Sequence, residues 1–189
     1  MKLAKMFSVV IVISILFPFN AHAKGYFSGS FGISKSQESG FEDDKGFKIG
    51  GGYKLNDNFA IEVAYVDLGE FEADDESVST LEFISGYSID KAYVEIDGFE
   101  FNVLASAPVS GNAAVFAKLG FFIWDAAAKV DFTSFGNQTV SDDDGNDLLF
   151  GIGFMVGVSK KVAFKCEYTR YDAFDGDSDL LSAGINLSF

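Results

Sequence analysis

Histidine, cysteine and proline are almost absent from this chain, and each absence excludes a class of structure or chemistry. The one histidine, His22, lies in the N-terminal segment, so a catalytic triad has no histidine base in the rest of the chain. Cys166 is the only cysteine, which rules out an internal disulfide. Pro108 is the only proline after the N-terminal segment, so long uninterrupted strands are permitted. We expect no enzyme activity, cofactor or bound metal.

Basic residues are also few. Lysine and arginine together number 14, aspartate and glutamate 28, and the formal net charge is −14. Nucleic-acid binding requires a basic surface, so we expect no nucleic-acid partner.

Long apolar runs are confined to the N-terminus. Lys2 and Lys5 precede the apolar stretch 6–17, and Ala21-His22-Ala23 follows it. A membrane helix needs about 20 apolar residues, more than this stretch offers. The pattern instead predicts a secretory signal peptide over residues 1–23, cleaved after Ala23, that leaves residues 24–189 as one domain.

Alternation of apolar with small or polar residues runs through the remaining sequence. In 179–189 the apolar residues fall at every second position and end at Phe189. This period of two is typical of a strand with one apolar and one polar face. Eight such segments occur, at 27–33, 47–53, 59–65, 99–105, 115–123, 148–158, 162–169 and 179–189. They predict an all-β protein, an eight-stranded antiparallel up-and-down transmembrane β-barrel.

The connections alternate in length, as in outer-membrane barrels with short periplasmic turns and long outer loops. The short ones are 56–58, 107–112 and 159–161, and the long ones are 34–45, 70–91, 126–146 and 172–178. This places both termini on the periplasmic side. The sequence leaves open whether 70–91 is a loop or extends the flanking strands.

The two strand faces differ in charge, which decides between two kinds of barrel. A soluble ligand-carrying barrel would turn its apolar face inward. Here the apolar face carries no charge, as lipid contact demands, because a lysine or arginine at mid-depth costs about 2–4 kcal/mol. The polar face carries three lysines and three glutamates, which we assign to the lumen: Lys48, Glu62, Glu100, Lys118, Lys165 and Glu167.

These six charges allow two interpretations. In the first they form a structural salt-bridge plug in a lumen that side chains fill. In the second the same network gates a narrow pore. Either way pairing is required, because an unpaired buried charge costs about 3–5 kcal/mol. The plug is the preferred interpretation.

Several stretches resemble the small outer-membrane barrel family typified by the membrane domain of outer-membrane protein A. They are 50–62, 65–69, 115–120, 150–153 and 167–171. The resemblance implies an eight-stranded barrel in a Gram-negative outer membrane, whose C-terminal aromatic strand the barrel assembly machinery recognises. Ile185, Leu187 and Phe189 match that signal. Two-domain members carry a peptidoglycan-binding domain after the barrel; because this sequence stops at the last strand, we expect no cell-wall tether.

Most of the acidic residues lie in the long connections. Asp142 to Asp147 and Asp172 to Asp179 superficially resemble calcium loops, but they lack the glycine and closing glutamate of an EF-hand. We expect a solvated surface, with divalent-cation bridging to lipopolysaccharide as a weaker alternative. Together with membrane lipids, lipopolysaccharide is therefore an expected partner, and host or surface ligands could bind the loops.

The expected function is structural or interactive: envelope integrity, or adhesion through the acidic loops. The alternative is a small low-conductance channel. Among single residues, Tyr53, Tyr65 and Tyr168 suit the membrane interface, Cys166 should act as a small apolar residue on the lipid face, and Trp124 should pack at the rim or interior.

Overall fold

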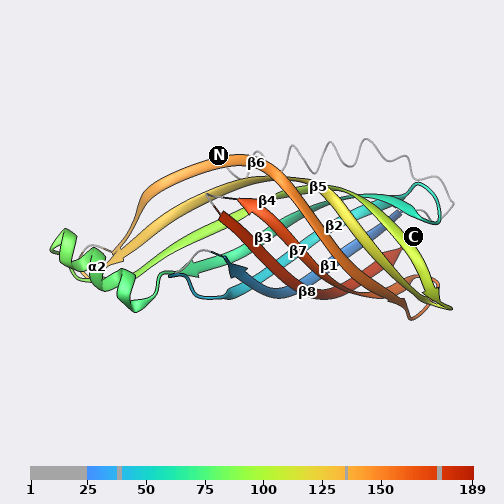
Figure 1. Ribbon diagram of the computed structural model, residues 1–189, viewed down its shortest axis with the longest axis horizontal. Helices are drawn as coiled ribbons and strands as arrows, with labels where there is room; N and C mark the ends of the chain where they lie inside the picture. Colours follow the sequence, from blue (N-terminus) through green and yellow to red (C-terminus); the bar gives the residue numbers. More distant parts are fainter. Residues whose placement is uncertain (1–24, 38–39, 135, 174–175) are drawn as a thin grey trace.

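The fold is a closed barrel of antiparallel strands, seen in a computed structural model that describes residues 25–37, 40–134, 136–173 and 176–189 (Figure 1). The elements in chain order are β1 (Gly25–Ser36), β2 (Asp44–Lys54), β3 (Phe59–Glu72), α2 (Asp75–Ser85), β4 (Ile89–Ser110), β5 (Ala113–Phe132), β6 (Gly136–Gly157), β7 (Val162–Ala173) and β8 (Gly176–Ser188). Each strand pairs with its sequence neighbours, and β1 pairs with β8 to close the ring. The predicted eight-stranded up-and-down barrel is confirmed. The predicted signal peptide, 1–23, lies outside the described residues.

Side chains alternate between the lumen and the outer surface along every strand. The outward apolar side chains are widely exposed, as Phe31 at 77% and Ile49 at 62% illustrate. Phe31, Phe47, Tyr65 and Phe99 follow one another across four strands, with neighbouring ring centroids 5.5–6.1 Å apart. Such a surface is stable only in contact with lipid, so the soluble barrel with an apolar interior is excluded.

Three strands are much longer than the sequence pattern predicts. β4 and β6 have 22 residues and β5 has 20, whereas about 9–11 suffice to cross a bilayer. The connection predicted over 126–146 is therefore wrong: β5 continues to Phe132, and β6 already begins at Gly136. The calcium-like run at Asp142 to Asp147 accordingly lies within β6 and forms no loop.

The connection over 70–91 is partly strand and partly helix. β3 reaches Glu72, and β4 begins at Ile89. Between them stands α2, at the far end of the extension that β4, β5 and β6 build beyond the other strands (Figure 1). No helix in the described ranges is long and apolar enough to cross a membrane.

A row of carboxylates marks where the extension leaves the apolar band. Asp67 pairs with Asp97, Asp97 with Asp125, and Asp125 with Asp144, so four neighbouring strands carry aspartate at one level. One outward position nearer the periplasm, the same strands carry Tyr65, Phe99, Ile123 and Asn146. We call this set the aspartate row.

Candidate functional site

The six charged residues assigned to the lumen all lie inside the barrel. They come from β2, β3, β4, β5 and β7, and none is more than 4% exposed. Because strand side chains alternate, inward parity alone carries each of them into the lumen.

Glu167 occupies the centre of the network. Its Oε1 lies 2.9 Å from Nζ of Lys118, and its Oε2 lies 3.1 Å from Nζ of Lys165. Lys48 donates a hydrogen bond to the same carboxylate. The Thr169 hydroxyl adds a hydrogen bond of 2.7 Å. One carboxylate thus joins all three lysines.

The other two glutamates complete the pairing. Glu100 accepts hydrogen bonds of 3.0 and 2.9 Å from Nζ of Lys118, and Glu62 lies 3.6 Å from Nζ of Lys165. Each glutamate also accepts a tyrosine hydroxyl, Tyr171 at 2.9 Å for Glu100 and Tyr26 at 3.0 Å for Glu62. Three positive and three negative groups therefore form one connected network, which carries no net charge when all six are ionised.

The two tyrosines and Thr169 were not among the predicted lumen residues. Their inward parity was readable, since Tyr26 precedes Ser28 and Tyr171 follows Thr169 on the polar faces of their segments. The glutamate that each tyrosine contacts depends on the stagger between neighbouring strands. The sequence of a single segment does not determine this stagger.

Glycine makes room for the large lumen side chains. A Cβ on Gly52 would lie 2.3 Å from Cζ of Tyr26, and one on Gly151 would lie 2.9 Å from Cε of Lys118. The glycines of the polar faces therefore leave space for the long side chains of neighbouring strands.

An apolar layer fills the outer part of the barrel and the root of the extension. Its centre is the contact between Phe122 and Tyr171, whose ring centroids are 4.8 Å apart. Trp124 is 6% exposed and donates its indole N–H to Asp147 at 2.8 Å, so it packs in the interior. We call the following buried cluster the outer apolar layer: Val66, Leu68, Phe71, Val94, Ile96, Phe122, Trp124, Ala126, Leu149, Tyr171 and Leu180.

The extension carries its own ion pairs beyond the membrane. Lys91 contacts Glu70 at 2.8 Å and Glu72 at 2.6 Å, and the hydrogen bond to Glu70, followed by that to Glu72, raises the pKa of Lys91. A hydrogen bond to Glu95 likewise raises the pKa of Lys129. These pairs hold β3, β4 and β5 side by side where lipid no longer surrounds them.

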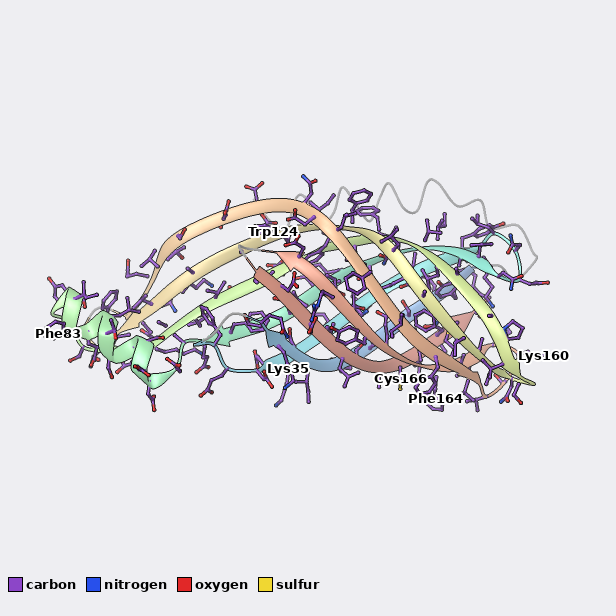
Figure 2. All side chains as sticks on the ribbon, in the orientation of Figure 1. Lys35, Phe83, Trp124, Lys160, Phe164 and Cys166 are labelled. Atoms are coloured by element: carbon purple, nitrogen blue, oxygen red, sulfur yellow. The ribbon has the colours of Figure 1, made fainter. Side chains whose placement is uncertain are left out.

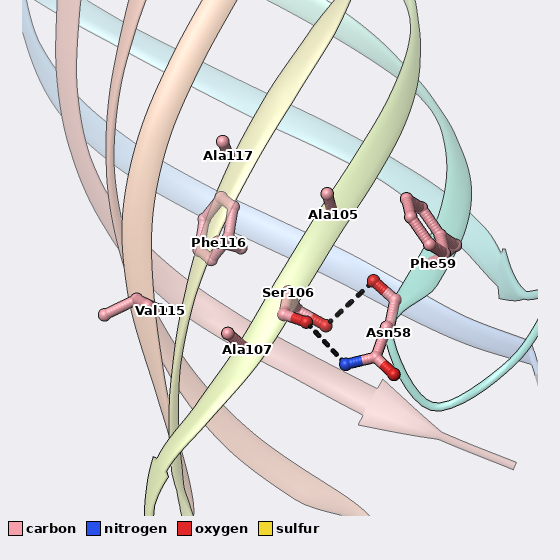
Figure 3. Close-up of a pocket in the computed structure, with 8 residues that line it drawn as sticks. All are labelled: Asn58, Phe59, Ala105, Ser106, Ala107, Val115, Phe116 and Ala117. Carbon is pink, nitrogen blue, oxygen red and sulfur yellow. Dashed lines mark hydrogen bonds between the residues drawn. The ribbon is translucent and has the colours of Figure 1, made fainter.

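A shallow hollow of about 340 Å³ lies near the periplasmic ends of β3, β4 and β5. Asn58 donates its side-chain N–H to the Ser106 carbonyl oxygen at 3.0 Å, as Figure 3 shows. The lining residues are Asn58, Phe59, Ala105, Ser106, Ala107, Val115, Phe116 and Ala117. None of them titrates, so the hollow offers no acid or base. Among the described residues, no three histidine, cysteine or acidic side chains converge closely enough to hold a metal ion.

Comparison with known families decides what this barrel is. The profile of the OmpA-like transmembrane domain matches residues 20–178. The chain belongs to this family. As an OmpA-like transmembrane domain, the protein lies in the cell outer membrane, as the sequence predicts.

Individual relatives agree with this assignment. Outer membrane protein A of Klebsiella pneumoniae is 23% identical over 92% of this chain, which spans about half (54%) of that relative's length. Ail, the attachment invasion locus protein of Yersinia pestis, superposes with a TM-score of 0.58 at 12% identity, over 89% of this chain and 99% of Ail. Neisserial surface protein A gives 0.56 at 15% identity, over 87% and 96%. A second structure of Ail, with the heparin analogue sucrose octasulfate, gives 0.54 at 16% identity, over 88% and 99%. The structural likenesses establish a shared fold.

Proposed function

We propose that this OmpA-like domain is a closed membrane anchor that displays an acidic extension at the cell surface, with a role in envelope integrity or adhesion. One observation carries the proposal: ion-paired charges and the outer apolar layer lie inside the barrel, whereas β4, β5 and β6 continue far beyond the other strands. Much of the chain therefore forms a surface structure, and the side chains in the lumen oppose transport through the barrel.

Planar-bilayer recording tests the closed barrel. We expect no reproducible conductance steps from the purified protein, with a large porin as the positive control. A combined Phe122→Ala and Leu149→Ala variant thins the outer apolar layer and should conduct if this layer is the seal. Regular steps from the unmodified protein that change with Lys118→Ala would instead support the small low-conductance channel.

Deletion of residues 74–88, which removes α2 and spares the barrel strands, tests the surface role. We expect the deleted protein to reach the outer membrane and, like the unmodified barrel, to migrate differently on detergent gels before and after boiling. Attachment of intact cells to host surfaces should fall. Unchanged attachment would leave only a role in the envelope itself.

We propose further that lipopolysaccharide contacts the aspartate row through divalent cations. The row lies one outward position beyond the apolar band, which would bring it near anionic headgroups, and like charges opposite one another on neighbouring strands are destabilising unless neutralised. Calcium titration by calorimetry should give heat with lipopolysaccharide present, and less heat after Asp97→Asn with Asp125→Asn. Equal heat from that variant would exclude the aspartate row as the site of cation-mediated contact with lipopolysaccharide.

A polyanion of the kind bound to Ail is a poor fit to this extension. Sucrose octasulfate is strongly negative, and so is the surface that includes the aspartate row and Asp142. We propose that host or surface ligands of the extension are cationic or reach it through divalent cations.

The barrel assembly machinery is the remaining proposed partner. Ile185, Leu187 and Phe189 all project from the outer side at the C-terminal end, each at least 40% exposed. The Phe189 ring also packs 5.0 Å from that of Phe27, across the β1–β8 closure. Deletion of Phe189 should lower the outer-membrane level severalfold, whereas Ser188→Ala should not. If the deleted protein refolds normally in detergent, the loss lies in assembly and not in stability.

A further inference from the structure

The tip of the extension exposes apolar side chains on a helix that is firmly held. Phe83 is 90% exposed and Ile84 75%, and Leu81 and Tyr87 are also exposed. In Figure 2, Phe83 lies at one end of the long axis and Lys160, on a periplasmic turn, at the other. Phe83 therefore lies at the end of the molecule opposite the periplasmic turn, so contact with its own bilayer does not account for its exposure.

The helix α2 is anchored by the opposite face. Val78 packs against the small apolar cluster of Ile89, Ala92 and Val130, and Glu82 accepts a hydrogen bond of 2.7 Å from the Ile89 N–H. Residues four apart share one helix face, so Phe83 and Ile84 fall on the outer side.

Both ends of α2 are capped. The Asp74 side chain accepts the Ser77 N–H at 2.8 Å, and Gly86, with a positive φ of 72°, donates its N–H to the Glu82 carbonyl oxygen at 2.8 Å. The Tyr87 ring meets Phe132 edge-on at 6.2 Å. These caps and the ring contact favour one orientation of the exposed face, which lowers the entropy that binding must remove.

Charge selects the partner for this face. Asp74, Asp75, Glu76 and Glu82 lie on or next to α2, and the sequence from Leu55 to Asp90 contains no basic residue. A second copy of the chain would bring an equally acidic tip, and an anionic bilayer would be repelled as well.

We propose that α2 docks, through Phe83 and Ile84, in an apolar groove of another protein whose rim carries lysine or arginine. This inference rests on the proposed surface role and specifies its partner. An amphipathic helix laid in an apolar groove is a common mode of recognition, and a basic rim matches the carboxylates of Asp75 and Glu76 on the same helix. Apolar contacts then supply affinity, and the charges supply selectivity and a faster encounter.

Selection from a random peptide library displayed on phage tests the proposal, with the full protein in nanodiscs and empty nanodiscs for counter-selection. We expect the enriched peptides to combine apolar residues with lysine or arginine. Phe83→Ser with Ile84→Ser should weaken their binding by about tenfold or more, the loss expected for removing a pair of anchors. Val140→Ser, an exposed apolar position on β6, is the matched control and should bind as the unmodified protein does.

A charge variant separates the two contributions. Asp75→Asn with Glu76→Gln leaves the apolar face intact and should weaken binding by a few-fold, with a smaller dependence on salt. All variants are compared after their heat-dependent gel mobility confirms that the barrel is folded.

The proposal is overturned if the enriched peptides are neutral or acidic, or if they bind the Phe83→Ser, Ile84→Ser variant equally well. Binding of phosphatidylcholine vesicles that depends on Phe83 would assign the tip to an apposed membrane, and Phe83-dependent self-association would assign it to a second copy. Either result also rejects the groove. The closed-barrel proposal is independent of these outcomes, because conductance tests it separately.

Discussion

Glu167 Oε1 and Lys118 Nζ lie 2.9 Å apart in the middle of the barrel, both fully shielded from solvent. Since Glu167 contacts all three lumen lysines, its replacement breaks three ion pairs at once and leaves Lys48 without its carboxylate partner. The network is therefore most sensitive at this residue.

Glu167→Gln should lower the free energy of unfolding by about 3–5 kcal/mol, the cost of breaking a buried pair from one side. Urea unfolding of the refolded protein in detergent measures this loss. The matched control is Glu70→Gln, which breaks a partly exposed pair with Lys91 and should cost less than about 1 kcal/mol. Equal losses at the two sites would mean that the lumen charges are effectively hydrated.

Gly52 and Gly29 offer a paired test of lumen packing. A Cβ on Gly52 would collide with the Tyr26 ring, whereas a Cβ on Gly29 would meet nothing within 4 Å. Gly52→Ala should therefore destabilise the barrel by about 1–3 kcal/mol, and Gly29→Ala should not. The same urea unfolding measures both. In a protein that already carries Tyr26→Ala, Gly52→Ala should lower the free energy of unfolding much less. Strictly additive losses from the two substitutions would contradict the contact.

The sequence predicts the barrel well wherever lipid surrounds it. Alternation with an uncharged outer face identifies eight segments, and inward parity places Lys48 and Glu100 in the lumen. The alternating pattern ends at Asp97 and Asp125, because outward charges appear there and resemble loop residues. Beyond the bilayer, both strand faces tolerate polar side chains, so the pattern no longer distinguishes a strand from a loop.

Helix α2 was missed for a different reason. Its signals are local: Asp74 three residues before Ser77, and Gly86 at the end. Each of these signals involves only one or two residues. The helix also has no fully buried residue, so no apolar stripe in the sequence indicates it. The pairing inside the lumen was also unpredictable in detail, because it depends on the stagger of the strands around the ring.

The free edge of β6 provides a third test. β7 pairs with β6 only from Leu149 to Gly157. In the part of the chain that the structure describes, the outer half of β6 is therefore hydrogen-bonded to β5 alone. Exposed carboxylates at Asp142 and Asp143 discourage identical edges from pairing. Asp142→Ser with Asp143→Ser should produce dimers that increase with protein concentration in analytical ultracentrifugation.

The control for that edge is Asp75→Ser with Glu76→Ser, which removes the same charge from α2. If both variants form dimers, the cause is the change in net charge. If neither forms dimers, the twist of the extension already protects the edge of β6.

The cap of α2 gives a pH dependence whose sign is fixed. The Ser77 N–H bond to Asp74 lowers the pKa of that carboxyl below its usual value. A lowered pKa means that the ionised carboxylate stabilises the folded helix, fully above the ordinary value of about 3.9 and progressively less as the pH falls through the lower folded value. Amide hydrogen exchange of residues 77–82, corrected for intrinsic rates, should therefore show a progressive loss of protection as the pH falls below about 4, while the barrel strands stay protected. Asp74→Asn retains a capping side chain without the charge, so its protection should not change over this range. Equal loss of protection in both proteins would show that ionisation of Asp74 does not stabilise the helix.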